Sequence, residues 1–409
     1  MNFSKRVREA NVLWFAVVSL LVFSLCACQP QAPKHPNPEP YQDSLTAYNY
    51  ERIKNGKADF VYAQYWYFNF LDDKGDTDAS NDVAGVGAFG IANPENLFFQ
   101  KGVVAGYGMI IRPAQEGTSF GMFGPFLNPA EPGNFSGSKT FESGQFSLVQ
   151  CPFGKVDVIS PDEYHTVGQV DEGARHIQWD LTYKRTLGPG WLCWQEWPLP
   201  ATLWVFPAWV NYYMPMPNAS VNGTFRVQDG ADDKTYTLSN AKGYHDGFFG
   251  KYVFSLIRAD WMDYKQDDPP LAIQLMSSHG LYTCQGGWDP CSPGVMRVVY
   301  NGAEYVFPRK AIEITYDQKA YDDKYKVYYP TQETIKARDP EGNMLEVHWT
   351  DVIHLMVYYP MPKPYKSTVS SEIIANVRGT FYEAKSKTTV PILGSGWTDW
   401  VSEAFADKR

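Results

Sequence analysis

The sequence is short of positive charge and of long apolar segments. It has 36 Lys and Arg residues against 45 Asp and Glu, which gives a formal net charge of −9. The first nine residues hold three bases and one acid, a net +2, so the rest of the chain is near −9 − 2 = −11. An acidic surface argues against a nucleic-acid partner and against electrostatic docking on anionic lipid. Beyond residue 27, no stretch approaches the roughly 18 apolar residues that a membrane-spanning helix needs.

Metal-binding and hydrolase patterns are also missing. None of the six cysteines forms a Cys-x-x-Cys pair. His348 and His354 share one face of an expected strand but lie roughly 20 Å apart at about 3.3 Å per residue, too far to hold one ion. No Gly-x-Ser-x-Gly segment occurs, which argues against an α/β-hydrolase. We therefore expect no metal and no cofactor.

The cysteines point instead to disulfides. Four of them follow Cys28, an even number that in an exported chain suggests two bridges. Cys284 and Cys291 flank a loop with glycine and proline and are the favoured pair, which leaves Cys151 with Cys193. Metal ligation by these four is the weaker interpretation because their spacing does not suit it.

The N-terminus resembles a lipoprotein leader. A basic start and an apolar stretch from Val12 to Leu25 precede Leu25-Cys26-Ala27-Cys28, which fits a bacterial lipobox. We expect residues 1–27 to be a signal peptide, Cys28 to carry lipid, and residues 28–57 to be a Pro-rich tether. Gln29 after the cysteine favours the outer membrane. The predicted location is the bacterial cell envelope, lipid-anchored and facing the periplasm; the alternatives are an ordinary secretory peptide and an uncleaved anchor.

The remaining chain has the pattern of a β protein with an internal repeat. Gly and Pro are abundant, aromatic residues make up 16%, and short alternating runs recur between turn signals. Four segments recur in the same order: Ile177–Trp179 as Val347–Trp349, Tyr212–Pro217 as Tyr358–Pro362, Val221–Phe225 as Val377–Phe381, and Tyr244–Asp246 as Trp397–Asp399. These echoes predict two related β domains, residues 58–260 and 261–409, joined near residues 255–270, with Asp267–Pro270 as the candidate linker. The alternative is that such short motifs are common in β proteins.

Strand alternation suggests which side chains face inward. Successive side chains of a strand point to opposite faces. From Leu345 to Tyr359, the odd positions are apolar except for Asp351. Ile177, Trp179, Leu181 and Tyr183 give the first half an equivalent face without an acid. We expect Trp179, Trp349 and Tyr244 to line an apolar chamber, with Asp351 as a second acid beside a bound ligand.

The segment Tyr244-His245-Asp246 is the best candidate site. It ends a predicted hairpin that starts at Tyr212-Tyr-Met-Pro-Met-Pro217 and runs through Val221-Asn-Gly-Thr-Phe225. This layout resembles the family of carotenoid 1,2-hydratases, AttH-like proteins and tocopherol-cyclase-like proteins, to which fungal Diels–Alderases are related. The resemblance is best over residues 204–261 and weaker over about 60–205 and 345–401. It implies two lipocalin-like (calycin-type) β-barrel or sandwich domains in tandem, and we expect a short C-terminal helix.

The same residues suggest acid chemistry. A carboxylic acid in an apolar pocket stays protonated near neutrality and could protonate an alkene. Aromatic faces such as Phe248 and Trp261 would stabilise the resulting cation. Alternation places Tyr244 and Asp246 on one face and His245 on the other, so Asp246 is the expected acid. The structural alternative is that Tyr244 and His245 only brace the hairpin.

One departure from the family complicates the function. Many members continue with His-Asn-Trp-Gly where this chain has Gly247-Phe-Phe-Gly250, so a second imidazole and an indole are missing. The sequence predicts an acid-assisted hydratase, cyclase or pericyclase acting on a hydrophobic polyene, isoprenoid or lipid. The alternatives are a non-catalytic carrier of such a ligand and a scaffold whose cavity is filled by its own aromatics. The oligomeric state is left open.

Overall fold

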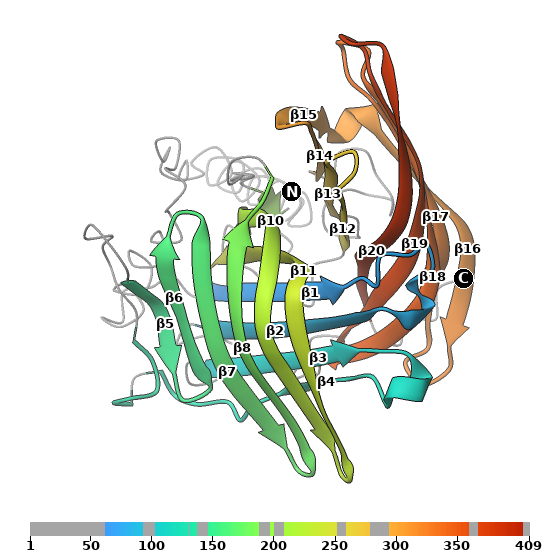
Figure 1. The fold of residues 1–409 in the computed structure, drawn as a ribbon. Helices are drawn as coiled ribbons and strands as arrows, with labels where there is room; N and C mark the ends of the chain where they lie inside the picture. The colour runs from blue at the N-terminus through green and yellow to red at the C-terminus, as the bar shows by residue number, and fades with distance from the viewer. Residues whose placement is uncertain are drawn as a thin grey trace, which may run out of the picture.

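The computed structural model describes residues 62–92, 103–129, 131–136, 146–187, 197–199, 208–251, 259–278, 294–359 and 367–403. Most of them lie in the strands of two large antiparallel sheets (Figure 1). The all-β class predicted from the sequence is therefore confirmed. The predicted leader, lipobox and tether lie outside the described residues.

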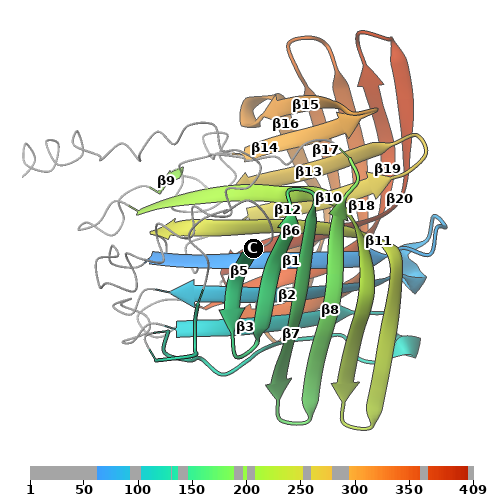
Figure 2. The same cartoon turned by 60° about the vertical axis from the view of Figure 1, so that its left-hand side comes forward.

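The first sheet has the strand order β4-β3-β2-β1-β11-β10-β8-β7-β6-β5, with β9 paired to β10. Its strands are β1 (Tyr62–Asp72), β2 (Val83–Ala92), β3 (Val103–Ile111), β4 (Phe120–Phe123), β5 (Phe146–Cys151), β6 (Gly154–Ser160), β7 (Glu163–Glu172), β8 (Arg175–Arg185), β9 (Trp197–Leu199), β10 (Ala208–Asp229) and β11 (Asp232–Lys251). Short 3₁₀ helices η2 (Ala79–Asn81) and η3 (Ala114–Glu116) lie in its connections. Strands β1 to β4 run across β6 to β8 (Figures 1 and 2), and β3 contacts both β7 and β8, so the sheet closes over its own core.

The second sheet has the order β15-β14-β13-β12-β20-β19-β18-β17-β16. Its strands are β12 (Ala259–Gln266), β13 (Leu271–Ser278), β14 (Gly294–Tyr300), β15 (Ala303–Pro308), β16 (Ile312–Asp322), β17 (Val327–Arg338), β18 (Met344–Tyr359), β19 (Thr368–Glu383) and β20 (Thr388–Glu403), with the 3₁₀ helix η5 at Arg309–Ala311. Tight turns join neighbours. Asn301 and Gly302 link β14 to β15 with φ of 48° and 78°, the positive pair that a two-residue hairpin turn requires.

The two sheets repeat one topology, as the recurring segments predicted. The order β3-β2-β1-β11-β10-β8-β7-β6 corresponds strand by strand to β14-β13-β12-β20-β19-β18-β17-β16. Ala219 pairs with Gly243 in the first sheet, and Ala375 pairs with Gly396 in the second. Strand β11 therefore corresponds to β20. The first sheet ends at Lys251 and the second begins at Ala259; the domain boundary at 260/261 stays a prediction.

One of the four recurring segments, Ile177–Trp179 matched to Val347–Trp349, is out of register in the structure. Val221 pairs with Tyr183 in the first sheet, and Val377 pairs with Trp349 in the second. The structural counterpart of Trp349 is therefore Tyr183, four residues beyond the Trp179 that the sequence match suggests. A shift by an even number of residues keeps each side chain on the same face of the strand, so the alternating pattern could not reveal it.

Each sheet has its own apolar core, and a third cluster lies between the sheets. Alternate residues of β1 show this: Trp66, Phe68 and Phe70 are in the core of the first sheet, whereas Leu71 and the ring of Tyr67 join the cluster between the sheets. We call this third group the interface cluster. Its buried members are Leu71, Ala79, Ala84, Val86, Ala88, Tyr107, Met109, Ile111, Met214, Tyr244, Trp261, Met276, Val357, Ile374 and Trp397.

A β-bulge corrects the predicted inner face of β18. Leu345, Val347 and Trp349 are buried in the core of the second sheet as expected. The register with β19 then shifts between Asp351 and Ile353. The extra residue turns the strand over, so the odd positions from Ile353 onward pack into the interface cluster instead. The single inner face expected from Leu345 to Tyr359 is wrong beyond the bulge.

Residues 388–403 form strand β20, and both of its faces are buried: Trp397 lies in the interface cluster and Trp400 in a separate cluster. Residues 404–409 lie outside the described part, so the short C-terminal helix stays a prediction. One further expectation is wrong. The segment Asp267–Pro270 is a tight turn between β12 and β13 within the second sheet, not a linker.

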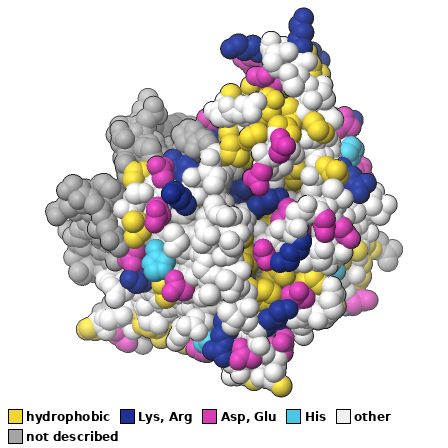
Figure 3. Space-filling view, in the orientation of Figure 1, with side chains coloured by type: hydrophobic (Ala, Val, Ile, Leu, Met, Phe, Trp, Pro, Cys, Tyr) yellow, Lys and Arg dark blue, Asp and Glu magenta, His cyan; other side chains and the backbone are white. Residues whose placement is uncertain are grey.

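The molecular surface carries both signs of charge. Acidic and basic side chains are interspersed on the face shown in Figure 3, and hydrophobic side chains gather in its upper part, over the second sheet. Within the described ranges, no helix is long and apolar enough to cross a membrane.

Candidate functional site

The three predicted residues of β11 divide between two faces, as alternation required. The Tyr244 hydroxyl donates to Asp246 Oδ2 at 2.7 Å and accepts from Trp261 Nε1 at 3.1 Å. His245 is on the opposite face, stacked on Phe68 with ring centroids 3.8 Å apart, and its Nδ1 donates to a backbone carbonyl at 2.9 Å. All three are buried. Tyr244 and Asp246 therefore face the second sheet, and His245 packs into the first core.

Two acids of the second sheet lie near Asp246. Glu372 on β19 and Asp399 on β20 are direct cross-strand partners. The Ser370 hydroxyl lies between them, 2.8 Å from Glu372 Oε1 and within hydrogen-bond distance of Asp399 Oδ1. A hydroxyl has one proton to donate, so it can serve both oxygens only if one carboxyl donates to it. The geometry thus indicates one proton held within the pair.

The electrostatics of the pair agree with this geometry. Burial raises the pKa of Glu372 to about 7, against hydrogen bonds from Ser370 and Trp397 that lower it. Burial, and then the charge of Glu372 with a smaller contribution from Asp246, raises the pKa of Asp399 well above its ordinary value. Like charges in a dry site cannot both ionise easily. The two carboxyls therefore titrate as a coupled pair, each with a raised pKa.

The internal repeat explains why these acids meet. Because β11 corresponds to β20 with Gly243 at Gly396, Asp246 and Asp399 occupy equivalent positions of the two halves. Their partners in the adjoining strands, Tyr67 and Trp261, are equivalent as well. The rings of those two residues meet edge to face, with centroids 6.4 Å apart. Equivalent faces of the two halves thus pack against each other and bring their acids together.

Three tyrosines surround the acids. Burial raises the pKa of Tyr67, Tyr107 and Tyr359 well above ordinary values, and the charges of Glu372 and Asp399 raise each further. The hydroxyls of Tyr107 and Tyr359 are hydrogen-bonded to each other. All three phenols stay protonated and can donate hydrogen bonds. Tyr67, Tyr359 and Asp399 are only partly buried, so the acids are not sealed from outside.

The chamber expected to be lined by Trp179, Tyr244 and Trp349 together is wrong. Trp179 lies in the first core, Trp349 in the second and Tyr244 in the interface cluster. Trp179 Nε1 donates to Thr166 Oγ1 at 3.0 Å, which satisfies its one donor. Their roles in ligand binding stay predictions.

The other predicted ligand residues are scattered. Trp261 lies at the acids, paired with Asp399 across the strands. Asp351 lies at the bulge, 3.4 Å from His354 Nδ1; burial raises its pKa and the imidazole opposes this. Phe248 belongs to β11, but its side chain lies outside the described ones. Trp261 is thus the predicted binding residue that the structure brings to the site.

A buried ion pair joins the sheets beside the acids. Lys265 Nζ lies 2.9 Å from Asp263 Oδ2 and also donates to the Gly243 carbonyl of the first sheet. Gln274 Nε2 bonds Asp263 Oδ1 at 3.1 Å and the Pro217 carbonyl at 3.2 Å. Burial lowers the pKa of Lys265 against the opposing effect of Asp263. We call this network the interface clasp.

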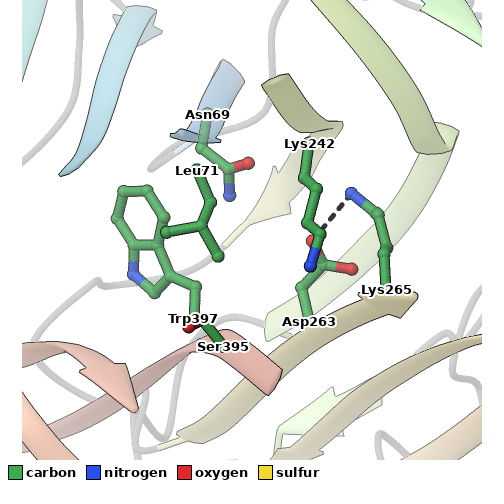
Figure 4. A pocket seen from close by; sticks show the side chains of 7 residues that line it. All are labelled: Asn69, Leu71, Lys242, Asp263, Lys265, Ser395 and Trp397. Carbon is green, nitrogen blue, oxygen red and sulfur yellow. Dashed lines mark ion pairs between the residues drawn. The ribbon is translucent and has the colours of Figure 1, made fainter. Parts of the chain in front are cut away.

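A small cavity adjoins the clasp. It measures about 10 Å³ and is lined by seven residues: Asn69, Leu71, Lys242, Asp263, Lys265, Ser395 and Trp397 (Figure 4). That volume holds one water molecule. Five of its seven lining residues are polar or charged, and the cavity is far too small for a polyene.

The cysteine and metal predictions are largely outside what the structure describes. Cys151 is a free, buried thiol in the first core, which gives no support to its pairing with Cys193. Burial raises its pKa to about 11. Cys28, Cys193, Cys284 and Cys291 lie outside the described residues, so lipidation and both disulfides stay predictions. Among the described side chains, no group of three or more His, Cys, Asp or Glu is placed to hold a metal ion.

Sequence reasoning missed Glu372 and the clasp lysine. Glu372 interrupts the otherwise uncharged run Thr368–Val377, and a charge inside a buried strand is a usable signal. Asp399 was visible through its match with Asp246, but the sequence could not show that the two halves pack with those positions facing. Nothing in the sequence around Lys265 distinguishes it from a solvated lysine.

Comparisons with known proteins agree on the fold. No protein-family model and no curated protein sequence matches the chain. Solved structures do: an AttH-like protein of Nitrosomonas europaea is 12% identical with a TM-score of 0.52, covering 84% of this chain and 93% of that one. CghA is 14% identical with a TM-score of 0.51, covering 85% and 90%, and was also solved with Sch210972. Kievitone hydratase from Nectria haematococca is 10% identical with a TM-score of 0.51, covering 84% and 89%.

The resemblance predicted from the sequence is thereby confirmed at the level of the fold. The chain shares the fold of these solved proteins.

Proposed function

We propose that the protein is an acid-assisted hydratase or cyclase for a hydrophobic unsaturated substrate, with its reaction centre between the two sheets. The observation that carries this is the Ser370 hydroxyl between Glu372 and Asp399, an arrangement that favours one proton shared within the acid pair. Support also comes from the fold, which the chain shares with a hydratase and with CghA, a Diels–Alderase solved with a small molecule.

The acids have two different roles, proton donor and proton acceptor. The pair Glu372–Asp399 donates its proton to one alkene carbon: the carboxyl O–H bond breaks, a C–H bond forms, and a cation remains at the other carbon. The faces of Trp261 and Tyr67 stabilise that cation. Water or an internal nucleophile then adds, and the surplus proton leaves to a carboxylate. Asp246, which accepts a hydrogen bond from Tyr244, takes this acceptor role in place of the acid role predicted from the sequence.

Deuterium labelling tests this chemistry. The purified protein is incubated in D₂O with an apolar extract of the cells that produce it, and products are analysed by mass spectrometry. We expect products with a new C–D bond, and a loss of about 10²–10⁴-fold in their formation for Glu372→Gln and Asp399→Asn. Glu346→Gln, on a half-buried position of β18, is the matched control.

Two outcomes would contradict the proposal. Products without carbon-bound deuterium would indicate a pericyclic reaction rather than protonation. Compounds that bind to the protein and are recovered chemically unchanged would favour the alternative of a non-catalytic carrier.

Membrane anchoring through Cys28 belongs to the same proposal, with the protein on the outer membrane facing the periplasm. It rests on the lipobox and the basic start of the sequence. Cys28→Ser should leave the protein soluble or unprocessed, which membrane fractionation with and without detergent measures. A Cys28→Ser protein that loses its leader and still sediments with membranes would disprove the anchor.

A further inference from the structure

The small cavity beside the interface clasp lies where the two halves of the molecule meet. Gly243 corresponds to Gly396, and Tyr67 corresponds to Trp261. Counting along the same strands, six of the seven lining residues form equivalent pairs, one residue from each half: Asn69 with Asp263, Leu71 with Lys265, and Lys242 with Ser395. Both halves are therefore needed to form this space, which we call the clasp cavity.

One hydrogen-bond donor in the clasp cavity lacks an acceptor. Asn69 is buried, with 2% of its surface exposed, and no atom of the described residues accepts from its Nδ2. Figure 4 shows its amide directed toward Lys242 and the Lys265–Asp263 pair. A buried amide nitrogen without a hydrogen bond costs free energy. This position therefore favours an occupant that accepts hydrogen bonds.

The two lysines of the cavity add further donors. An ammonium has three N–H groups and cannot accept. Lys242 donates to Asp73, whereas Lys265 donates to the Gly243 carbonyl and lies 2.9 Å from Asp263 Oδ2. Within the described part of the chain, each lysine thus keeps at least one N–H group for an occupant of the cavity.

Acceptors and negative charge are scarce on the same walls. Asp263 is the one acid among the seven lining residues, and its Oδ1 and Oδ2 already contact Gln274 and Lys265. The lining carries two positive charges and one negative charge. A water molecule would need acceptors for its own two protons, whereas an anion only accepts. Burial lowers the pKa of Lys265, and a second negative charge beside its ammonium would offset that effect.

The size of the clasp cavity limits the occupant to one small ion. Its volume of about 10 Å³ is that of a single-water site, and chloride is only slightly larger than water. Lys242 is the partly exposed member of the lining, with 20% of its side chain accessible. An ion can therefore enter beside Lys242.

We propose that the clasp cavity binds one monatomic anion, chloride, between the two halves of the molecule. Asn69 and Lys242 hold it from the first sheet and Lys265 from the second. The bound ion adds a contact across the interface that neither sheet makes alone. The site is separate from the proposed acid chemistry and does not depend on it.

Urea unfolding of the purified protein at constant ionic strength tests the site, with sodium chloride replacing sodium gluconate. Gluconate is too large for the cavity. Chloride should raise the urea midpoint, because it binds the folded state and not the unfolded chain. For a dissociation constant of about 10 mM, chloride at ~100 mM lowers the unfolding equilibrium constant roughly tenfold.

Matched variants assign the effect to the cavity. Asn69→Leu and Lys242→Met should each lose most of the chloride dependence, whatever their stability in gluconate. Lys234→Met should keep it. Lys234 lies on the same strand, β11, and pairs with Glu116 at 2.7 Å, but it does not line the cavity.

Two results would overturn the site. Equal midpoints for the wild-type protein in chloride and gluconate would mean that water fills the cavity. A chloride effect retained in both Asn69→Leu and Lys242→Met would place the ion elsewhere. If these variants do not fold, anomalous diffraction from bromide in wild-type crystals decides: a peak between Asn69 Nδ2 and Lys265 Nζ supports the site, and no peak there rejects it.

Discussion

At the scale of the residue, position between the sheets decides what each acid can do. Asp246 accepts a hydrogen bond from Tyr244, whereas Glu372 shares the Ser370 hydroxyl with a second acid, Asp399. The sequence singled out Asp246 because it stands in a recognisable Tyr-His-Asp run. It gave no means of deciding whether Asp246 or Glu372 holds the proton, since that depends on neighbours from other strands, such as Asp399 on β20.

The raised pKa of Glu372 makes a prediction about stability. An unfolded Glu titrates near 4.3, and the folded one near 7, so between these values the folded state holds a proton that the unfolded state has lost. The free energy of unfolding should therefore fall as pH rises from about 4.5 to 7 and then level off. Glu372→Gln removes this contribution. Denaturant unfolding should show the variant gaining up to about 3 kcal/mol on wild type between pH 5 and pH 8.

Comparing each variant with wild type at both pH values cancels the titrating groups that do not interact with Glu372, and any constant cost of the amide. Glu346→Gln, whose carboxylate is accessible, should show no such gain. A difference between Glu372→Gln and wild type that is the same at pH 5 and pH 8 would mean that Glu372 ionises normally.

At the scale of the element, the alternation of side chains predicted which face of a strand each residue occupies, except where a β-bulge shifts the register. Ile177, Trp179, Leu181 and Tyr183 are all buried in one core, as their spacing indicated. The same reasoning on β18 fails at Asp351, because one extra residue there exchanges the two faces. A bulge leaves no mark in composition when residues on both sides of the strand are buried and apolar.

At the scale of the whole molecule, the sequence predicted two related halves but not how they pack. The recurring segments located equivalent strands, and the strand order bears this out. Separate apolar clusters replace the single chamber that was expected, because the outer face of β1–β3 packs against β18–β20. The acids of both halves meet only through this arrangement. The proposed site therefore depends on whatever fixes the two sheets against each other.

The interface clasp is the candidate for that role. Lys265→Met would leave Asp263 as a buried charge without its ammonium partner and would remove the bond to Gly243, so we expect a loss of about 3–5 kcal/mol in the free energy of unfolding. Lys265→Met combined with Asp263→Leu removes both charges. It should recover most of that stability, because two apolar side chains replace the pair. Denaturant unfolding of the single and double variants measures the difference. If the double variant is no more stable than Lys265→Met, the unpaired charge of Asp263 is not the cause of the lost stability. If the clasp also sets the position of the acids, the double variant should be stable yet slow in the deuterium assay, since packing alone does not restore the hydrogen bond that holds β12 on the Gly243 carbonyl next to Tyr244.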